Sequence, residues 1–256
     1  MLHEPGGGAA PRGAIVYVQP FAEEMNKSRR MAALQSRALA ARGWMVVQPD
    51  LEGCGDSEGE FGSCDWRSWV ADVIDAAAYV GERSGLTPKM WGLRAGCLLA
   101  CAAARQLPDA TDIVMWQPVA SGSAFLRQFL RLKVAAAMFG SAEQKVDSKS
   151  LLDALAQGRA VEIAGYTVGP ALAAGLEEAR LEPAATPARV CWLEVSNRTP
   201  AELAPAAATP LAAFAKQGHL VTAQAVTGPP FWQTQEIEEC PALLDATCTA
   251  LDAWLA

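Results

Sequence analysis

The stretch from Gly92 to Gly96 has the residue spacing of a nucleophile elbow. In that motif, G-x-S-x-G, a sharp turn between a strand and a helix presents a nucleophilic side chain, and the glycines let the two elements approach closely. Here the central residue is Arg94 instead of Ser or Cys. A guanidinium stays protonated and cannot attack a carbonyl carbon, but its planar fork of N–H donors suits a carboxylate or a phosphate. The motif therefore predicts anion binding at Arg94.

Acyl transfer by a triad also requires a histidine base and an acid that orients it. The base is expected in the loop after the last predicted strand, but that loop, from Gly228 to Trp232, contains no histidine. The chain has two histidines: His3, in a Gly-rich N-terminal segment expected to be mobile, and His219, which precedes that strand. Where the acid is expected, Asn197 follows a predicted strand and Glu194 lies inside it. All three triad positions are therefore predicted to be vacant.

Three other side chains are candidates for an unconventional nucleophile. Cys54 and Ser57 lie in a Gly-rich loop at 50–62, and Cys97 follows Arg94 by three residues. A thiol without a histidine base can be activated by a helix N-terminus or a nearby arginine. The ordinary alternative is that these residues serve packing and loop structure. The seven cysteines form no CxxC pair and no zinc spacing, and neither a metal nor an organic cofactor is expected.

Alternating strands and helices have to position these residues. Apolar runs bounded by Gly or Pro predict buried strands, and apolar residues at helical spacing predict helices that cover them. The predicted strands are 14–19, 44–48, 89–93, 112–117, 188–195 and 220–227, and the predicted helices are 26–42, 66–80, 95–105 and 242–255. This alternation is typical of a mainly parallel sheet with helices on both faces.

Residues 121–187 interrupt the alternation. This interval predicts helices and loops with no clear strand, and we expect it to form a helical insertion, or cap, within a single domain that spans 1–256. The Pro- and Ala-rich stretches at 182–188 and 200–210 are expected to be loops of that domain rather than linkers.

The order of these elements is similar to that of the α/β-hydrolase fold over nearly the whole chain. More narrowly, the sequence resembles the exosortase A system-associated hydrolase 2 family, which is found beside exosortase and exopolysaccharide genes in bacteria. The segments that carry the resemblance are 20–30 (PFAEEMNKSRR), 49–59 (PDLEGCGDSEG), 91–96 (WGLRAG) and 228–232 (GPPFW). The resemblance implies the α/β-hydrolase fold; the word hydrolase in the family name follows that fold.

Glu23 and Glu24 follow the first predicted strand, where hydrolases of this fold place the oxyanion-hole loop. Two carboxylates suit neither an oxyanion nor a phosphate, so we expect them to neutralise Arg94, or one of them to act as a base. Arg94 is expected to contact Glu23 or Glu24, Glu194, or a bound anion. The residues expected to bind a ligand are Arg94, Ala95, Phe21, Glu23, Glu24 and Trp232.

Composition excludes several functional classes. Apolar residues make up 51% of the 256 residues, and 21 Lys and Arg against 28 Asp and Glu give a formal net charge of −7. Without clustered basic residues, nucleic-acid binding is not expected. The longest apolar runs are about half of what a bilayer requires. With no signal-peptide pattern at the N-terminus, we expect a cytoplasmic protein without a membrane span.

Three functions remain. The first is a pseudoenzyme that binds a small anionic or acyl ligand, or a partner protein, in the exosortase and exopolysaccharide setting. The second is a hydrolase or acyltransferase that acts on an ester or thioester through unconventional residues. The third is a structural subunit of the companion exosortase-associated hydrolase. Among eight tryptophans, Trp232 lies in the loop expected at the mouth of the site, where aromatic side chains often anchor a partner.

Overall fold

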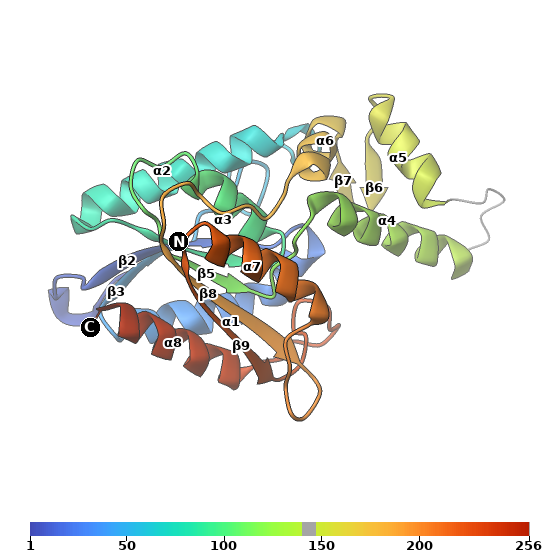
Figure 1. The fold of residues 1–256 in the computed structure, drawn as a ribbon. Coiled ribbons are helices and arrows are strands. Elements are labelled where there is room, and N and C mark those ends of the chain that lie inside the picture. Colours follow the sequence, from blue (N-terminus) through green and yellow to red (C-terminus); the bar gives the residue numbers. More distant parts are fainter. Residues whose placement is uncertain (140–146, 256) are drawn as a thin grey trace. The chain divides into compact units, whose positions relative to one another are not determined.

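The computed structural model describes residues 1–139 and 147–255. Its central feature is a seven-stranded sheet in the order β1-β3-β2-β4-β5-β8-β9 (Figure 1). The strands are β1 (Leu2–His3), β2 (Gly13–Val18), β3 (Trp44–Val47), β4 (Lys89–Leu93), β5 (Ile113–Trp116), β8 (Arg189–Ser196) and β9 (Leu220–Thr227). All neighbours pair in parallel except β1, which runs antiparallel to β3. The expected mainly parallel sheet is confirmed.

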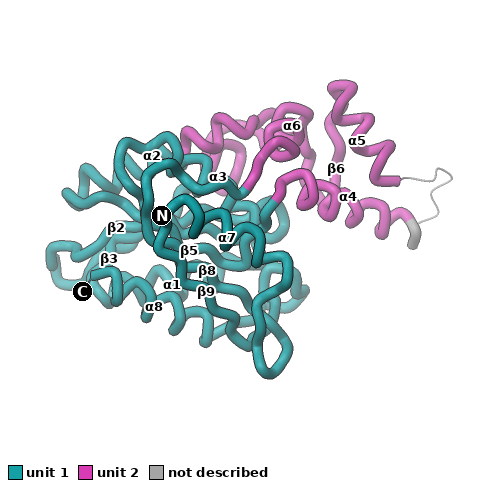
Figure 2. The backbone as a smooth tube through the Cα atoms, in the orientation of Figure 1, with its two compact units in different colours: residues 1–49, 73–120, 181–256 teal, residues 50–72, 121–180 magenta. Residues whose placement is uncertain are grey.

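The described chain forms two compact units (Figure 2). The first consists of residues 1–49, 73–120 and 181–256 and contains the whole seven-stranded sheet. The second consists of residues 50–72 and 121–180. Helix α2 (Trp66–Ser84) begins in the second unit and continues into the first.

Helices cover both faces of the sheet in the first unit, as predicted. Helices α1 (Glu23–Ala40) and α8 (Pro241–Leu255) lie on one face, and α3 (Gly96–Ala104) with residues 73–84 of α2 lies on the other (Figure 1). Helix α7 (Ala208–Lys216) precedes β9. No helix among the described residues has the length and apolar character that crossing a bilayer requires.

The sheet's register brings the carboxyl ends of its central strands to one level. Leu93 of β4 pairs with Trp116 of β5, which in turn pairs with Leu193 of β8. Ligands bind at this edge of open parallel sheets. The core beneath it is aromatic: the Trp91 ring lies 4.3 Å from Tyr17 and 4.6 Å from Trp116 between centroids. Large buried rings hold these strand ends in place.

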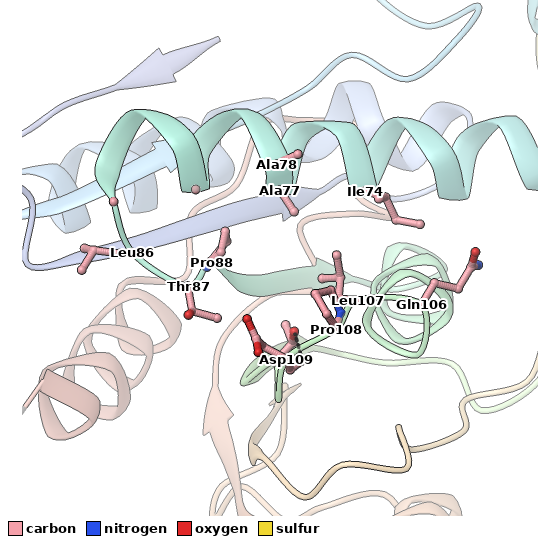
Figure 3. A pocket seen from close by; sticks show the side chains of 13 residues that line it. Ile74, Ala77, Ala78, Leu86, Thr87, Pro88, Gln106, Leu107, Pro108 and Asp109 are labelled. Carbon is pink, nitrogen blue, oxygen red and sulfur yellow. Dashed lines mark hydrogen bonds between the residues drawn. The ribbon is translucent and has the colours of Figure 1, made fainter.

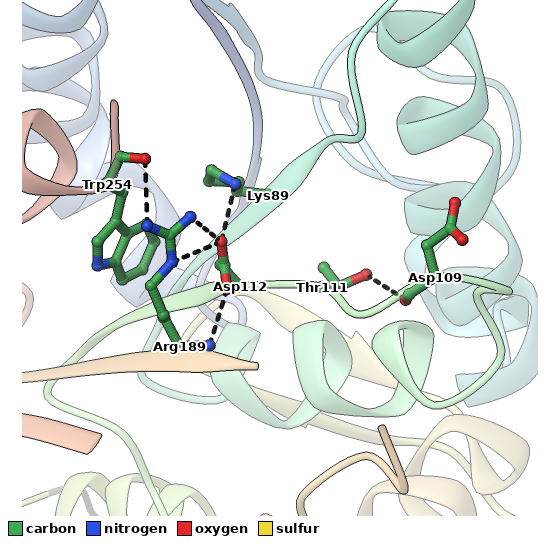
Figure 4. A network of polar contacts seen from close by, with 6 residues as sticks. All are labelled: Lys89, Asp109, Thr111, Asp112, Arg189 and Trp254. Atoms are coloured by element: carbon green, nitrogen blue, oxygen red, sulfur yellow. Dashed lines mark hydrogen bonds and ion pairs between the residues drawn. The ribbon is translucent and has the colours of Figure 1, made fainter. Parts of the chain in front are cut away.

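The amino ends of the same strands are joined by an ion-pair cluster around Asp112 (Figure 4). Its carboxylate accepts hydrogen bonds from Lys89 Nζ at 2.8 Å and from Arg189 Nη2 at 2.7 Å, Nε at 3.1 Å and backbone N at 2.8 Å. Arg189 also donates to the Trp254 carbonyl and lies 5.2 Å from the Trp254 ring centroid. The cluster therefore ties helix α8 to the sheet.

The second unit contains α4 (Gly122–Phe139), α5 (Ser148–Ala156), α6 (Pro170–Glu178) and a two-stranded hairpin, β6 (Val161–Ile163) with β7 (Tyr166–Val168). The expectation of helices and loops without a strand is therefore wrong at this hairpin. Each strand has three residues, too few to show an alternating apolar pattern. That 121–187 forms a cap within one domain stays a prediction.

Three other elements differ from the expected ones. Helix α1 begins at Glu23 instead of residue 26, so both glutamates lie in its first turn rather than in a loop. His3 pairs with Val46 in strand β1, so the expected mobile position of this histidine is wrong. Helix α7 was not predicted, and it begins inside the stretch 200–210 that was expected to be a loop.

Candidate functional site

Arg94 forms the sharp turn that the motif predicts. Its φ of +56° is in the left-handed region, which residues with a Cβ rarely adopt and which costs on the order of 1–3 kcal/mol. The turn is held from both sides: Arg94 N donates to the Trp116 carbonyl at 2.9 Å, and Cys97 N donates to the Arg94 carbonyl at 3.0 Å. Strand β4 thus ends, and α3 begins two residues later, with Arg94 at the tip.

The flanking glycines explain why the turn can be this tight. A Cβ on Gly92 would lie 2.7 Å from Cys97 Cα, and a Cβ on Gly96 would lie 2.3 Å from the Val18 carbonyl oxygen. Real Cβ atoms do not approach backbone atoms so closely, so neither position has room for a side chain. The close approach of strand and helix expected of a nucleophile elbow is therefore present.

The Arg94 guanidinium is paired with Glu24. Arg94 Nε donates to Glu24 Oε1 at 3.1 Å, and the two residues are only 8% and 7% exposed. Glu24 reaches this position because α1 begins at Glu23, where acidic side chains in the first turn also interact favourably with the helix dipole. The expectation that Arg94 contacts Glu23 or Glu24 is met by Glu24.

Trp232 covers the same guanidinium. Its ring centroid lies 5.7 Å from Arg94 Cζ, within cation–π range, and 5.1 Å from the Phe231 ring. Trp232 is only 3% exposed. In the described structure this ring packs against Arg94 instead of forming an exposed rim, and a role of Trp232 in binding a partner stays a prediction.

Several buried polar atoms of this cluster have no hydrogen-bond partner among the described residues. They are Glu23 Oε2, Glu24 Oε2 and Trp232 Nε1. Such atoms are rare in folded proteins and call for an explanation such as water, an ion or a ligand. Burial, with a smaller contribution from neighbouring Glu23, raises the pKa of Glu24 to about 7 despite the opposing effect of Arg94. The pKa of Glu23 is also raised by burial.

Phe21 and Ala95, the other residues expected to bind a ligand, border the same turn. Both are buried. The Phe21 carbonyl accepts a hydrogen bond from Glu24 N at 3.2 Å, and the Ala95 carbonyl accepts one from Leu98 N at 3.0 Å. Between Phe21 and Glu23, Ala22 has a φ of +53°. Both segments therefore bring strained backbone to the carboxyl edge of the sheet.

The three alternative nucleophiles are buried or hydrogen-bonded to the backbone. Cys97 is fully buried, its Sγ lies 3.7 Å from the Trp116 carbonyl oxygen, and burial raises the pKa of its thiol well above the usual value. A thiol with such a pKa is protonated and unreactive. Cys54 and Ser57 belong to the second unit; Cys54 is buried, and Ser57 Oγ donates to the Asp50 carbonyl at 2.6 Å.

His219 and Glu194 lie where the sequence places them relative to the strands. His219 precedes β9, accepts a hydrogen bond from Ala188 N at Nδ1 (3.1 Å) and has Nε2 3.0 Å from the Ala184 carbonyl oxygen. It joins loops at the amino edge, opposite Arg94. Glu194 accepts from Trp192 Nε1 at 2.8 Å and from Ala204 N at 2.6 Å, so its carboxylate stabilises β8 and the following loop.

Gln117 at the carboxyl edge was missed. It follows β5 directly, has a φ of +44°, and its side-chain Oε1 accepts a hydrogen bond from Val195 N at 2.8 Å. Its own backbone N donates to the Leu193 carbonyl at 2.7 Å. The sequence carries no signal for this residue, because neither a motif nor a glycine marks the turn.

A cavity of about 550 Å³ lies at the other edge of the sheet (Figure 3). It is lined by residues of α2 and by the segments that precede β4 and β5, among them Ile74, Ala77, Leu86, Thr87, Leu107 and Asp109. Asp109 is the charged residue among the described residues that line it. This volume would hold a small molecule, but the elbow lies at the opposite end of β4.

Metal binding has no evident place in the described part of the chain. No group of three or more His, Cys, Asp or Glu residues there is arranged to hold an ion. The groups present at the elbow are the Arg94 guanidinium, the Glu24 carboxyl group and the Trp232 indole ring.

Comparisons with known proteins define the class of fold. The chain is similar to Est1E from Butyrivibrio proteoclasticus, solved with ferulic acid, with a TM-score of 0.67 and 17% identity over 100% of this chain and 95% of that one. It is also similar to a thermostable carboxyl esterase from Bacillus coagulans (TM-score 0.64, 11% identity, 100% and 93% covered). An esterase domain from a Rhodothermus marinus protein gives 0.60 and 15%, with 99% and 90% covered.

The protein has the α/β-hydrolase fold, and esterases are among its structural neighbours. No protein-family model matches the sequence, and no curated protein matches it. The narrower resemblance to the exosortase A system-associated hydrolase 2 family therefore stays a prediction. Identities of 11–17% support the fold and leave the reaction to be argued from the site.

Proposed function

We propose that this protein is a non-hydrolytic α/β-hydrolase-fold protein that binds a small anionic or acyl ligand at Arg94. The observation that carries the proposal is the elbow itself: its strained turn and close-packed glycines are kept, while a guanidinium occupies the nucleophile position. A fold that maintains such strain without a nucleophile is best explained by a binding role for the side chain at the tip. We place this role in the exosortase and exopolysaccharide setting that the sequence resemblance implies.

The electrostatics of the elbow support an anionic partner. Arg94 lies directly ahead of α3, whose first backbone N–H groups favour negative charge. The guanidinium already interacts with one carboxylate, that of Glu24, at 3.1 Å. An arginine in this environment can hold the carboxylate of an acid or polarise the carbonyl of an acyl group.

Hydrolysis through unconventional residues is the less supported alternative. The raised pKa of Cys97 and its burial argue against a thiolate, and the Ser57 hydroxyl is engaged with the Asp50 backbone. The loop from Gly228 to Trp232 has no histidine to activate either group.

Two measurements on the purified protein test the proposal. We expect no turnover of simple aryl esters and no labelling by a fluorophosphonate probe, together with a ligand-induced rise in Tm for small carboxylic acids that is lost in Arg94→Ser. Stoichiometric labelling of Ser57, or turnover that disappears in Cys54→Ala or Cys97→Ala, would establish hydrolysis instead. Equal Tm shifts in the wild type and Arg94→Ser would place the binding elsewhere.

A further inference from the structure

The Arg94–Glu24 pair already has the form of a carboxylate bound at the elbow. Glu24 Oε1 accepts from Arg94 Nε at 3.1 Å, while Glu24 Oε2 is buried without a partner among the described residues. Arginine binds carboxylates most strongly when both oxygens accept hydrogen bonds in parallel. Glu24 therefore binds the guanidinium through one of its two oxygens. The other oxygen is buried without a partner among the described residues, which lowers the stability of the fold.

With Glu24 ionised, one carboxylate already balances the charge of Arg94, so an anionic ligand is favoured only if Glu24 becomes neutral. Glu23 and Glu24 are consecutive in the first turn of α1, and both carry a buried oxygen without a partner. Glu23 repels the charged form of Glu24, and it is Glu24 that forms an ion pair with the guanidinium. An incoming anion would add a further negative charge in a buried environment, where repulsion is weakly screened.

We propose that the ligand of this site is a monocarboxylate that takes the place of Glu24 at the Arg94 guanidinium, and that Glu24 takes up one proton from solvent as the ligand binds. The proposal rests on the proposed function and names its ligand class and its regulation. An O–H bond forms on Glu24 with the proton from solvent, and no other covalent bond changes. The ligand's two oxygens replace one oxygen of Glu24, and neutral Glu24 no longer repels the bound anion.

The groups that act on Glu24 within the sheet-containing unit come from three places. Glu23 and Lys27 lie on α1, Arg94 lies at the elbow and Tyr17 lies on β2. Cys97 on α3 interacts with Tyr17 and Arg94. Burial and Glu23 favour the neutral carboxyl, whereas Arg94 and Lys27 favour the ionised one. Burial also raises the pKa values of Tyr17 and Cys97, so both stay neutral near pH 7.

A pKa of Glu24 of about 7 puts this exchange in the physiological range. Below pH 7 Glu24 is already neutral, and ligand affinity is expected to be independent of pH. Above pH 7 the proton has to be taken up on binding, so Kd is expected to rise about tenfold per pH unit. At pH 8 binding should take up about one proton per ligand.

The experiment is a calorimetric titration of the full chain with benzoate, octanoate and ferulate between pH 6 and 8.5, in two buffers of different ionisation enthalpy. The neutral amides of the same acids and inorganic phosphate serve as comparison ligands. We expect carboxylates to bind with proton uptake at pH 8, and the amides and phosphate to bind at least about tenfold more weakly, since neither supplies a planar carboxylate.

Two matched variants separate the role of Glu24 from that of its neighbour. Glu24→Gln should bind carboxylates at pH 8 about as tightly as the wild type does at pH 6, with no proton uptake. Glu23→Gln should keep the pH-dependent loss of affinity, with its midpoint moved to lower pH because one repelling carboxylate is gone. Circular dichroism before each titration ensures that both variants are folded.

The outcomes separate the two proposals. Carboxylate binding without proton uptake, or with an unchanged pH dependence in Glu24→Gln, overturns the replacement of Glu24 and leaves the proposed function standing. Phosphate binding tighter than carboxylate binding overturns the ligand class. If no probe binds either the wild type or Glu24→Gln, the proposed function itself fails.

Discussion

Two ion-pair clusters lie at opposite edges of the same sheet, and they differ in how well they are satisfied. At the amino edge, Asp112 accepts four hydrogen bonds from Lys89 and Arg189. At the carboxyl edge, Glu24 accepts one from Arg94 through Oε1, and its Oε2 has no partner among the described residues. Burial would raise the pKa of Asp112, but the bonds from Arg189 and Lys89 hold it below the usual value. Burial raises the pKa of Glu24 to about 7.

This difference distinguishes a fully bonded carboxylate, which stabilises the fold, from one that we propose to take part in ligand binding. Hydrogen bonds from several donors stabilise the ionised form of a carboxylate. Exchanging one of these donors for a ligand would then bring no gain in free energy. A buried pair with an unpartnered oxygen next to strained backbone is costly to the fold. The four hydrogen bonds to Asp112 and the single one to Glu24 agree with the different roles that we assign to the two carboxyl groups.

The largest expected effect tests how closely β2 and α3 pack at the carboxyl edge of the sheet. Gly96→Ala places a Cβ 2.3 Å from the Val18 carbonyl and 2.5 Å from the Gln19 carbonyl, so β2 and α3 would have to separate. We expect a loss of about 3 kcal/mol or more in the free energy of unfolding, measured by urea denaturation. Gly6→Ala, which meets no atom within 4 Å, is the control. A neutral Gly96→Ala would show that the turn is not close-packed.

The next effect tests the amino edge. Asp112→Asn keeps the shape of the side chain but points an N–H₂ group at Lys89 or Arg189, leaving two cations without a carboxylate. We expect a loss of about 2–3 kcal/mol. Asp109→Asn is the matched control: Asp109 is exposed in the same loop (Figure 4), and no described residue forms an ion pair with it. Equal stabilities of the two variants would remove the contrast between the edges.

Much of the sheet was predictable from the sequence because its strands are buried apolar runs bounded by Gly or Pro. Residues 89–93 are an example, observed at the predicted bounds. The left-handed turn at Arg94 was also predictable, since Gly92 and Gly96 mark a turn without room for a Cβ. The hairpin at 161–168 was not, because three-residue strands carry too little pattern to be distinguished from loop.

The pairing within the site was predictable only as a choice between Glu23 and Glu24. The decision depends on where α1 begins, and the residue before the helix, Ala22, offers no capping side chain to mark it. Once the helix starts at Glu23, consecutive side chains project about 100° apart, and Glu24 reaches Arg94. Burial of Trp232 depends on tertiary packing that no local pattern encodes.

The pH dependence of stability sharpens the contrast between the two carboxylates. The raised pKa of Glu24 means that the folded state binds more protons than the unfolded state between about pH 4.5 and 7, so stability falls as pH rises through this window. The lowered pKa of Asp112 has the reverse sign: its stabilisation is present above its unfolded pKa and is lost as pH falls through its folded pKa.

We therefore expect the free energy of unfolding of the wild type to decline between pH 5 and 8 relative to Glu24→Gln, by on the order of 2 kcal/mol. Urea denaturation of both proteins across this range gives the difference directly, and the contribution of His3 cancels in it. Parallel curves for the two proteins would show that Glu24 is ionised throughout and that the two edges do not differ.

The smallest expected effect concerns the indole rings. Trp232→Phe removes a buried N–H that has no partner among the described residues, whereas Trp116→Phe removes one that donates to Thr247 Oγ1 at 2.8 Å. Both lose similar volume from buried sites, but only Trp116→Phe also breaks a hydrogen bond. We expect Trp116→Phe to be the more destabilising by about 1 kcal/mol, measured as the difference in urea midpoints at equal m-values. Trp232→Phe should still fold, because Phe keeps a ring over Arg94.

If Trp232→Phe instead costs more than Trp116→Phe, the Trp232 N–H is bonded in the ligand-free protein, most simply by water. The carboxyl edge would then be satisfied before any ligand arrives, and its resemblance to the Asp112 cluster would be closer than the hydrogen bonds of the described residues indicate.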